Sequence, residues 1–184
     1  MMPYQSLYKV DHHFGVEVMS EHERLRQAGD EVESVWDYPR PPRIEHCTRH
    51  LVVKYDGLVI AATRSSWRVL ETSHPPTFYI PPDTVRHELL VPSRRRTFCE
   101  FKGRANYWHI QKNKHISTDA AWSYAHPTPA FSCIKDHYAF YPSRVHECYV
   151  DGEPVNAQPG DFYGGWITGD IKGPFKGDPG TGHW

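Results

Sequence analysis

Prolines and glycines interrupt this sequence at short intervals, and their spacing limits the elements that the chain can form more than any other feature. The 184 residues include 16 prolines and 13 glycines. Proline cannot donate a backbone hydrogen bond, and glycine weakens the interior of helices and strands. Aromatic residues, which favour strands, make up 14% of the chain. We therefore expect a mainly β domain of short antiparallel strands joined by tight turns.

The length fits one hydrophobic core with an extension at each end. Residues 1–43 are predicted to hold an arm, a helix over residues 20–36 and a proline-rich linker, because Ser20 and Glu23 have capping-box spacing. Residues 44–155 should form the β domain. Residues 156–184 are rich in glycine, proline and aromatic residues, and we expect them to be ordered only if the aromatic side chains dock on the body.

Two local patterns make specific predictions about turns. The pair Asp56–Gly57 suits the positive φ angles of a type I′ turn, so it predicts a hairpin between strands over residues 50–55 and 58–63. Residues 92–96 contain three consecutive arginines after a proline, and they are predicted to form a basic surface turn. We expect roughly eight strands in the β domain.

Charge and composition exclude several partners. The formal net charge is -1 and the pI is about 6.9, so no global field favours nucleic acid or an anionic membrane, and neither is expected as a partner. The chain lacks an apolar run of the ~20 residues that a membrane helix needs, and its N-terminus does not resemble a signal peptide. We expect a cytoplasmic protein. The four cysteines form no C-x-x-C pair and the histidines lack metal-ligand spacing, so we expect no metal and no cofactor.

Residues 67–82 combine apolar, charged and rigid residues more densely than the rest of the chain. In a strand, Trp67, Val69 and Glu71 share one face, which places a carboxylate in line with residues typical of a core. The prolines that follow hold the chain extended, and residues 77–80 are predicted to form a second short strand. Glu71 and Tyr79 are therefore expected to face one cleft.

Five ordered segments resemble the domain-of-unknown-function family 427: RVLETSHPP (68–76), YIPP (79–82), CEFKGRANYW (99–108), WSY (122–124) and AFYP (139–142). The resemblance covers about residues 44–150, and residues 33–42 and 162–167 resemble flanks of longer members. It implies a compact, tent-like antiparallel β fold, shared with methionine sulfoxide reductase B and related zinc proteins. Those relatives bind zinc through two C-x-x-C pairs that this chain lacks. The family is also labelled as nucleotidyltransferases.

The candidates for catalysis are Glu71, Lys102 and Tyr79. Glu71 and Lys102 lie on neighbouring predicted strands, where a carboxylate and an amine can shift each other's pKa and bind a polar ligand. The alternative is a structural salt bridge beneath aromatic residues. In an enzyme, Glu71 or Tyr79 would act as general acid or base, and Lys102 or Arg68 would stabilise developing negative charge.

A wider set of residues could bind the ligand, since aromatic side chains stack a ring and nearby polar groups orient it. The same aromatic residues are typical of a hydrophobic core. A thiol in this set would be a nucleophile only with a base beside it, such as His109, and is otherwise an inert buried thiol. The ligand-binding candidates are Arg68, Trp67, Cys99, Tyr107, Trp108, Trp122 and Tyr124.

The sequence leaves three functions open. The first is a pocket in the β domain that binds a small polar or aromatic molecule. The second is a non-enzymatic interaction or self-association module, in which the predicted helix and the aromatic tail form the face of a homo-oligomer. The third is a nucleotidyltransferase, which needs a phosphate loop and paired carboxylates for Mg²⁺. The glycine-rich run at residues 177–182 is followed by no helix that could present its amides to phosphate.

Overall fold

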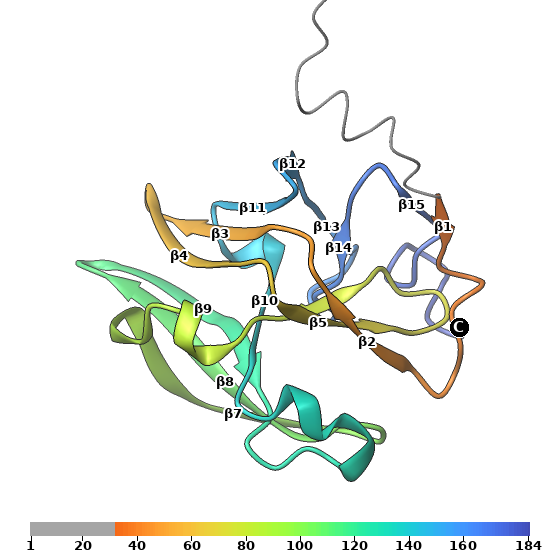
Figure 1. The fold of residues 1–184 in the computed structure, drawn as a ribbon, viewed down its shortest axis with the longest axis horizontal. Coiled ribbons are helices and arrows are strands. Elements are labelled where there is room, and N and C mark those ends of the chain that lie inside the picture. Colours follow the sequence, from red (N-terminus) through yellow and green to blue (C-terminus); the bar gives the residue numbers. More distant parts are fainter. Residues whose placement is uncertain (1–31) are drawn as a thin grey trace, which may run out of the picture. The chain divides into compact units, whose positions relative to one another are not determined.

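The computed structural model describes residues 32–184, and nearly all regular structure in that range is β strand (Figure 1). Within the range the helices are four short 3-10 turns: η1 (Pro82–Thr84), η2 (His87–Leu89), η3 (Pro129–Ile134) and η4 (Pro142–Arg144). The longer strands are β2 (Arg43–Cys47), β3 (Leu51–Tyr55), β4 (Leu58–Thr63), β5 (Ser66–Leu70), β6 (Thr77–Tyr79), β7 (Leu90–Cys99), β8 (Gly103–Lys112), β9 (His115–Ser123), β10 (Tyr138–Phe140) and β11 (Glu147–Val150). Five strands have only two residues: β1 (Glu33–Ser34), β12 (Glu153–Pro154), β13 (Asn156–Ala157), β14 (Trp166–Ile167) and β15 (Ile171–Lys172).

Three larger sheets are wholly antiparallel. Their strand orders are β10-β9-β8-β7, β12-β11-β3-β4 and β2-β5-β6. The pair β13–β14 is also antiparallel, whereas β1 and β15 pair in parallel. The prediction of a mainly β, antiparallel domain is confirmed. None of the helices in residues 32–184 is long and apolar enough to cross a membrane.

The hairpin between β3 and β4 has the predicted turn. Asp56 and Gly57 have φ angles of 49° and 72°, and Tyr55 pairs with Leu58 across them. Positive φ at both central residues defines a type I′ turn, whose twist matches that of the two strands. The local sequence was sufficient for the turn and the pairs beside it, whereas a bulge between Val53 and Lys54 shifts the register beyond them, so that Val53 pairs with Ala61.

The predicted basic turn at residues 92–96 is wrong, because these residues lie inside β7. Pro92 pairs with Trp108 and Arg96 with Asn106, so four steps along β7 match two along β8. The extra residues form a bulge, which accommodates a proline that cannot donate to the ladder. The Ser93 hydroxyl accepts a hydrogen bond from the backbone N–H of Arg95 within it. The bulge allows three arginines to occur inside a strand.

The helix predicted for residues 20–36 is wrong at its C-terminal end, and residues 20–31 lie outside the described residues. Glu33 and Ser34 form β1, and a turn follows. Val35 is fully buried in a small cluster with Tyr38 and Ile171. Pairing with β15 and burial of this valine favour the extended backbone over the helix that apolar spacing indicated.

The C-terminal extension docks on the body of the domain. The Trp166 side chain is 1% exposed, its Nε1 donates to the Phe140 carbonyl oxygen at 3.1 Å, and its ring centre lies 5.2 Å from that of Phe78. In Figure 1 the blue strand β15 lies beside β1, with which it pairs. The extension therefore supplies core residues to the domain.

Buried side chains form two main clusters. The first is aliphatic and includes Leu51, Val53, Ile60 and Ile110, with Trp166 packed among them. The second is aromatic and joins β5 and β6 to β8, β9 and η3; its buried members are Val69, Tyr79, Ala105, Tyr107, Trp122, Tyr124, Phe131, Ile134, Ala139 and Tyr141. The aromatic cluster lies against the pocket described next.

Candidate functional site

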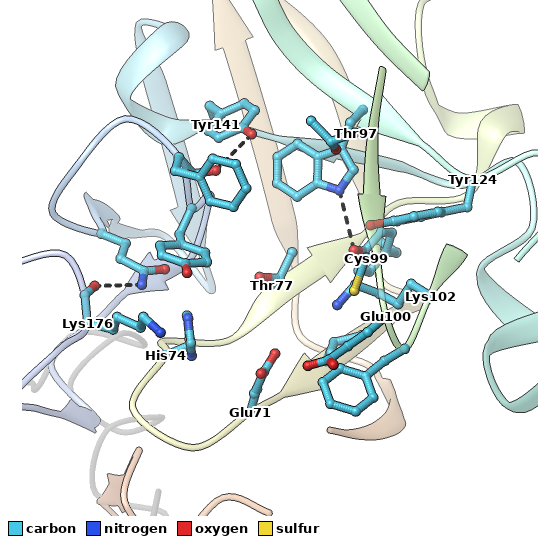
Figure 2. A pocket seen from close by; sticks show the side chains of 18 of the residues that line it. Glu71, His74, Thr77, Thr97, Cys99, Glu100, Lys102, Tyr124, Tyr141 and Lys176 are labelled. Carbon is cyan, nitrogen blue, oxygen red and sulfur yellow. Dashed lines mark hydrogen bonds between the residues drawn. The ribbon is translucent and has the colours of Figure 1, made fainter. Parts of the chain in front are cut away.

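A pocket of about 420 Å³ lies between parts of the chain that are far apart in sequence (Figure 2). One wall comes from β5, β6 and the loop between them. A second comes from the end of β7 and the β7–β8 turn, and a third from the segment at residues 158–176. The lining is completed by Tyr107 of β8, Trp122 of β9 and three residues outside the strands, Arg40, Tyr124 and Tyr141. The volume falls in the range of small-molecule sites.

Glu71 follows β5 directly, and its carboxylate points into the pocket (Figure 2). Its Oε1 lies 3.1 Å from Nη1 of Arg40, whose Nη2 lies 2.9 Å from Oε1 of Glu100. The guanidinium carbon also lies 5.5 Å from the centre of the Phe101 ring. The Arg40 side chain is 49% exposed, so this guanidinium joins two carboxylates where solvent reaches the site.

Lys102 does not pair with Glu71, so the structural salt bridge that the sequence left open as an alternative does not form between them. It lies in the β7–β8 turn, with Nζ 5.8 Å from the centre of the Phe131 ring. Within residues 32–184 none of the ion pairs closer than 4 Å includes its ammonium. Figure 2 places Lys102 and Cys99 on the same side of the pocket. The Lys102 charge is therefore available to a bound molecule.

Tyr79 and Tyr124 are buried phenols in the aromatic wall. Trp122 Nε1 donates to the Tyr79 hydroxyl at 3.4 Å, and the ring centres of Tyr79 and Tyr124 lie 6.2 Å apart. Burial raises the pKa of both hydroxyls well above the ordinary tyrosine value. Both phenols therefore stay protonated, which suits hydrogen bonding and opposes a role for Tyr79 as a general base.

Two further tyrosines of the wall are fixed by their own contacts. The Tyr107 hydroxyl lies 2.9 Å from the Thr97 hydroxyl, and the Tyr141 hydroxyl donates to the Phe162 carbonyl oxygen at 3.1 Å. The Tyr141 ring centre lies 4.5 Å from that of Trp122. Because these rings are held by hydrogen bonds and packing, the wall is formed in advance of any ligand.

His74 occupies the loop between β5 and β6, and its side chain is 8% exposed. Its Nδ1 lies 2.9 Å from the Thr72 carbonyl oxygen, and its ring centre lies 4.6 Å from that of Tyr163 in an edge-on arrangement. Burial lowers the pKa of His74, so the imidazole is neutral at physiological pH.

The Gln158 side chain forms two hydrogen bonds within the C-terminal wall. Gln158 accepts from the backbone N–H of Gly165 at 3.1 Å and donates through Nε2 to the Lys176 carbonyl oxygen at 2.8 Å. The Lys176 ammonium donates to the main-chain oxygen of Trp184 and lies 5.8 Å from the centre of the Tyr163 ring. The Gln158 amide thus links the backbone at Gly165, next to Tyr163, to the backbone at Lys176.

Most residues predicted for the site line this pocket. They are Glu71, Tyr79, Cys99, Lys102, Tyr107, Trp122 and Tyr124. The expectation that Glu71 and Tyr79 face one cleft holds in the structure, although Glu71 pairs with Arg40. These residues remain candidates for ligand binding.

The other three predicted residues, Arg68, Trp67 and Trp108, are not in the pocket lining. Arg68 lies on the opposite face of β5, where Nη1 is 2.8 Å from Glu33 and Nη2 is 2.5 Å from Glu45. Strand alternation explains this placement, since its neighbour Val69 faces the pocket.

Trp67 and Trp108 have structural contacts instead. Trp67 packs edge-on against His46, with ring centres 5.4 Å apart. Trp108 Nε1 donates to the Ser123 hydroxyl at 2.9 Å, and its ring packs 5.6 Å from that of Tyr138. The alternation of β8 turns Trp108 away from the face that carries Tyr107.

Sequence reasoning missed four charged or imidazole side chains of the pocket: Arg40, His74, Glu100 and Lys176. His74 lies inside a segment that resembles the family. No acidic or basic residue at a recognisable spacing from it indicated that it belongs to a site. Arg40 and Lys176 come from the flanks, and only long-range packing brings them to the site. The described residues contain no group of three or more His, Cys, Asp or Glu side chains arranged to hold a metal ion.

Taken together, the strands and the pocket define a mainly antiparallel β domain with an aromatic-walled, charged cavity. Residues of the β domain and of the segments before and after it line this cavity. The chain belongs to the family described as a domain of unknown function, DUF427, which has the short name NTP_transf_9 and whose model matches residues 43–151. The match confirms the resemblance drawn from the sequence. The search of curated proteins returns no match.

Proposed function

We propose that the pocket binds a small anionic molecule that contains a flat, unsaturated ring. The observation that carries this proposal is the meeting, in one cavity, of an aromatic wall with two lysine ammonium groups, neither of which pairs with an Asp or Glu of residues 32–184. The residues come from β5–β6, the β7–β8 turn and the C-terminal segment, so their convergence does not follow from local folding.

The balance of charge in the lining favours an anion. Three permanent cations, Arg40, Lys102 and Lys176, line the pocket together with two carboxylates, Glu71 and Glu100. Arg40 is shared between the two carboxylates, which leaves both lysines without a carboxylate partner among the described residues. A carboxylate or phosphate on a ligand would form charge-assisted hydrogen bonds with a free ammonium.

The aromatic wall supports a ring as the body of the ligand. Trp122, Tyr124 and Tyr141 have fixed orientations, and flat faces of this kind stack or pack edge-on against another ring. The family's short name refers to nucleotide transfer, and nucleotides combine a ring with an acidic group. They therefore belong among the molecules to be tested.

The finer parts of the assignment are also proposals. The antiparallel sheets that share the aliphatic core support a tent-like arrangement of the kind found in methionine sulfoxide reductase B. All four cysteines are free thiols, which supports a reducing compartment such as the cytoplasm. In an enzyme built on this pocket, Lys102 is the residue best placed to stabilise developing negative charge.

Thermal-shift measurements with ring-containing acids and matched neutral molecules test the proposal. Benzoate, phenylacetate and adenosine monophosphate are compared with benzyl alcohol and adenosine. We expect at least one acid to stabilise the protein where its neutral partner does not. Lys102→Met should reduce that stabilisation, because it removes the unpaired ammonium. Lys114→Met is the matched control, since Lys114 is exposed in the β8–β9 turn, outside the pocket. Equal stabilisation of wild type and Lys102→Met by every acid would contradict the proposed contact.

A further inference from the structure

The His74 imidazole is a buried polar group whose hydrogen bonding is incomplete. Its Nδ1 is 2.9 Å from the Thr72 carbonyl oxygen. Its Nε2 is buried and has no hydrogen-bond partner among residues 32–184. Since a buried polar atom without a partner costs free energy, such an atom beside a cavity indicates a group that is supplied from outside the chain.

The Thr72 contact determines which nitrogen of His74 carries the proton. A carbonyl oxygen can only accept, so Nδ1 carries the hydrogen and Nε2 holds a lone pair. Burial lowers the pKa of this ring, the nearby Lys176 and Lys102 charges act in the same direction, and Glu71 opposes them. The Nε2 atom is therefore a hydrogen-bond acceptor.

A donor lies at the same end of the pocket. In Figure 2 the Lys176 side chain extends toward the His74 ring. Its ammonium has three N–H groups, of which one donates to the main-chain oxygen of Trp184. A hydroxyl can satisfy both residues at once, because it donates through its hydrogen and accepts through its oxygen.

The opposite end of the pocket carries a cation. Figure 2 shows His74 and Lys176 on one side, Lys102 on the other, and Thr77 and Glu71 between them. A ligand that contacts both ends needs a hydroxyl at one end and an acidic group at the other. The ring of the ligand would then lie along the aromatic wall.

We propose that the natural ligand is a hydroxylated aromatic acid, whose O–H donates to His74 Nε2, whose hydroxyl oxygen accepts from Lys176 Nζ and whose acid group faces Lys102. This inference rests on the proposed function and extends it to a class of ligand. Because Nε2 is sealed from solvent and the Tyr163 ring packs edge-on against the imidazole, the proposal requires the side chains around Nε2 to shift when the hydroxyl binds.

Titration calorimetry with three matched acids tests the inference: 4-hydroxyphenylacetate, phenylacetate and 4-methoxyphenylacetate. With the full chain we expect the hydroxyl compound to bind about tenfold more tightly than phenylacetate, because it alone satisfies the buried acceptor. The methoxy compound can accept but cannot donate, so it should lose this advantage. His74→Phe should abolish the preference, so that the affinity ratio of the hydroxyl compound to phenylacetate falls from about tenfold to about one.

The chain offers a matched control in His137, which is only partly buried, lies outside the pocket lining and has the same local arrangement. Its Nδ1 lies 3.0 Å from the carbonyl oxygen of Lys135, two residues earlier. His137→Phe should retain the preference for the hydroxyl compound. If His74→Phe does not fold, ¹⁵N spectra of the wild type provide the second measurement. The Nε2 resonance of His74 should be that of an unprotonated nitrogen, and it should shift with 4-hydroxyphenylacetate and not with phenylacetate.

The outcomes separate this inference from the proposed function. Equal affinity for the hydroxyl and unsubstituted acids would indicate that a buried water satisfies Nε2. This result would overturn the inference and leave the proposed function standing. A preference that persists in His74→Phe, or a protonated Nε2, would overturn it as well. Failure of all three acids and of the nucleotides to bind would overturn the proposed function and this inference together.

Discussion

A Cβ atom on Gly164 would lie 2.4 Å from Cη2 of Trp122. The glycine belongs to the C-terminal wall of the pocket and the tryptophan to the aromatic wall, so the two walls meet at this contact. Real Cβ atoms do not approach so closely, and Trp122 is held by the rings of Tyr79 and Tyr141. The absence of a side chain at Gly164 is what lets the C-terminal segment close on the domain.

Gly164→Ala should therefore destabilise the protein by about 1–3 kcal/mol, the usual cost of overpacking a fitted interior. Chemical denaturation followed by tryptophan fluorescence measures the change. Gly182→Ala is the control, because a Cβ there meets no atom within 4 Å. Equal midpoints for the two variants would show that the C-terminal wall does not pack on Trp122 in solution.

Arg68 is predicted to stabilise the fold without contributing to binding. Its guanidinium pairs with Glu33 and Glu45, and its side chain is 17% exposed. Arg68→Met leaves Glu33 without its cation and Glu45 with only Arg43, which should cost about 2 kcal/mol of unfolding free energy. Arg86→Met, at an exposed pair 3.9 Å from Glu88, should cost less than about 0.5 kcal/mol.

The affinity for acids provides the contrast for Arg68. Ring-containing acids should bind Arg68→Met as tightly as wild type, because Arg68 faces away from the pocket. The affinities are measured below the melting temperature of the variant. A large loss of affinity in a folded Arg68→Met protein would return this residue to the binding site.

Removal of the Glu71 charge should strengthen the binding of acids. Glu71→Gln leaves Arg40 with only Glu100 as a partner, so the pocket gains positive charge. We expect the affinity for phenylacetate to rise about threefold at low salt and the gain to shrink as ionic strength increases. Glu88→Gln is the control, since Glu88 is exposed and outside the lining. Weaker binding by Glu71→Gln would indicate that the carboxylate itself contacts the ligand.

His74 should make folding stability depend on pH in a defined direction. Burial lowers the pKa of His74 in the folded protein below its ordinary value of 6.5. As pH falls below about 6.5 the unfolded chain takes up a proton that the folded chain does not, so stability decreases toward acid. Above that value both states are neutral and the stability from His74 is fully present.

The measurement is the free energy of unfolding between pH 7.5 and pH 5 for wild type and His74→Phe. The variant should show a smaller loss toward acid than wild type, and His137→Phe should match wild type. Identical pH profiles for wild type and His74→Phe would mean that this imidazole is protonated or exposed in the folded protein.

Local rules predicted the elements whose conformation is set by a few adjacent residues. Asp56 and Gly57 determine a turn type by themselves, and the strands around it follow. The alternation of residues 67–71 also predicted that Glu71 lies beside apolar side chains in the domain. The same alternation placed Arg68 on the other face, where it meets Glu33 and not a ligand.

The errors arose where distant parts of the chain decide the outcome. Helical spacing around Val35 is overridden by pairing between β1 and β15, and the arginines of β7 are accommodated by a bulge that only the partner strand defines. Lys176 reaches the pocket because Gln158 holds the segment that carries it. No spacing within the sequence encodes such contacts, so the contribution of the two flanks to the pocket could not be predicted.

The loop that carries His74 is joined to both flanks of the domain. The backbone N–H of Ser73 donates to the Val35 carbonyl oxygen, and that of Lys176 donates to the Ser73 carbonyl oxygen. Amide hydrogen exchange at Ser73 and Lys176 should therefore slow together when the pocket is occupied, because one opening event exposes both. These two amides can report occupancy without any label on the ligand.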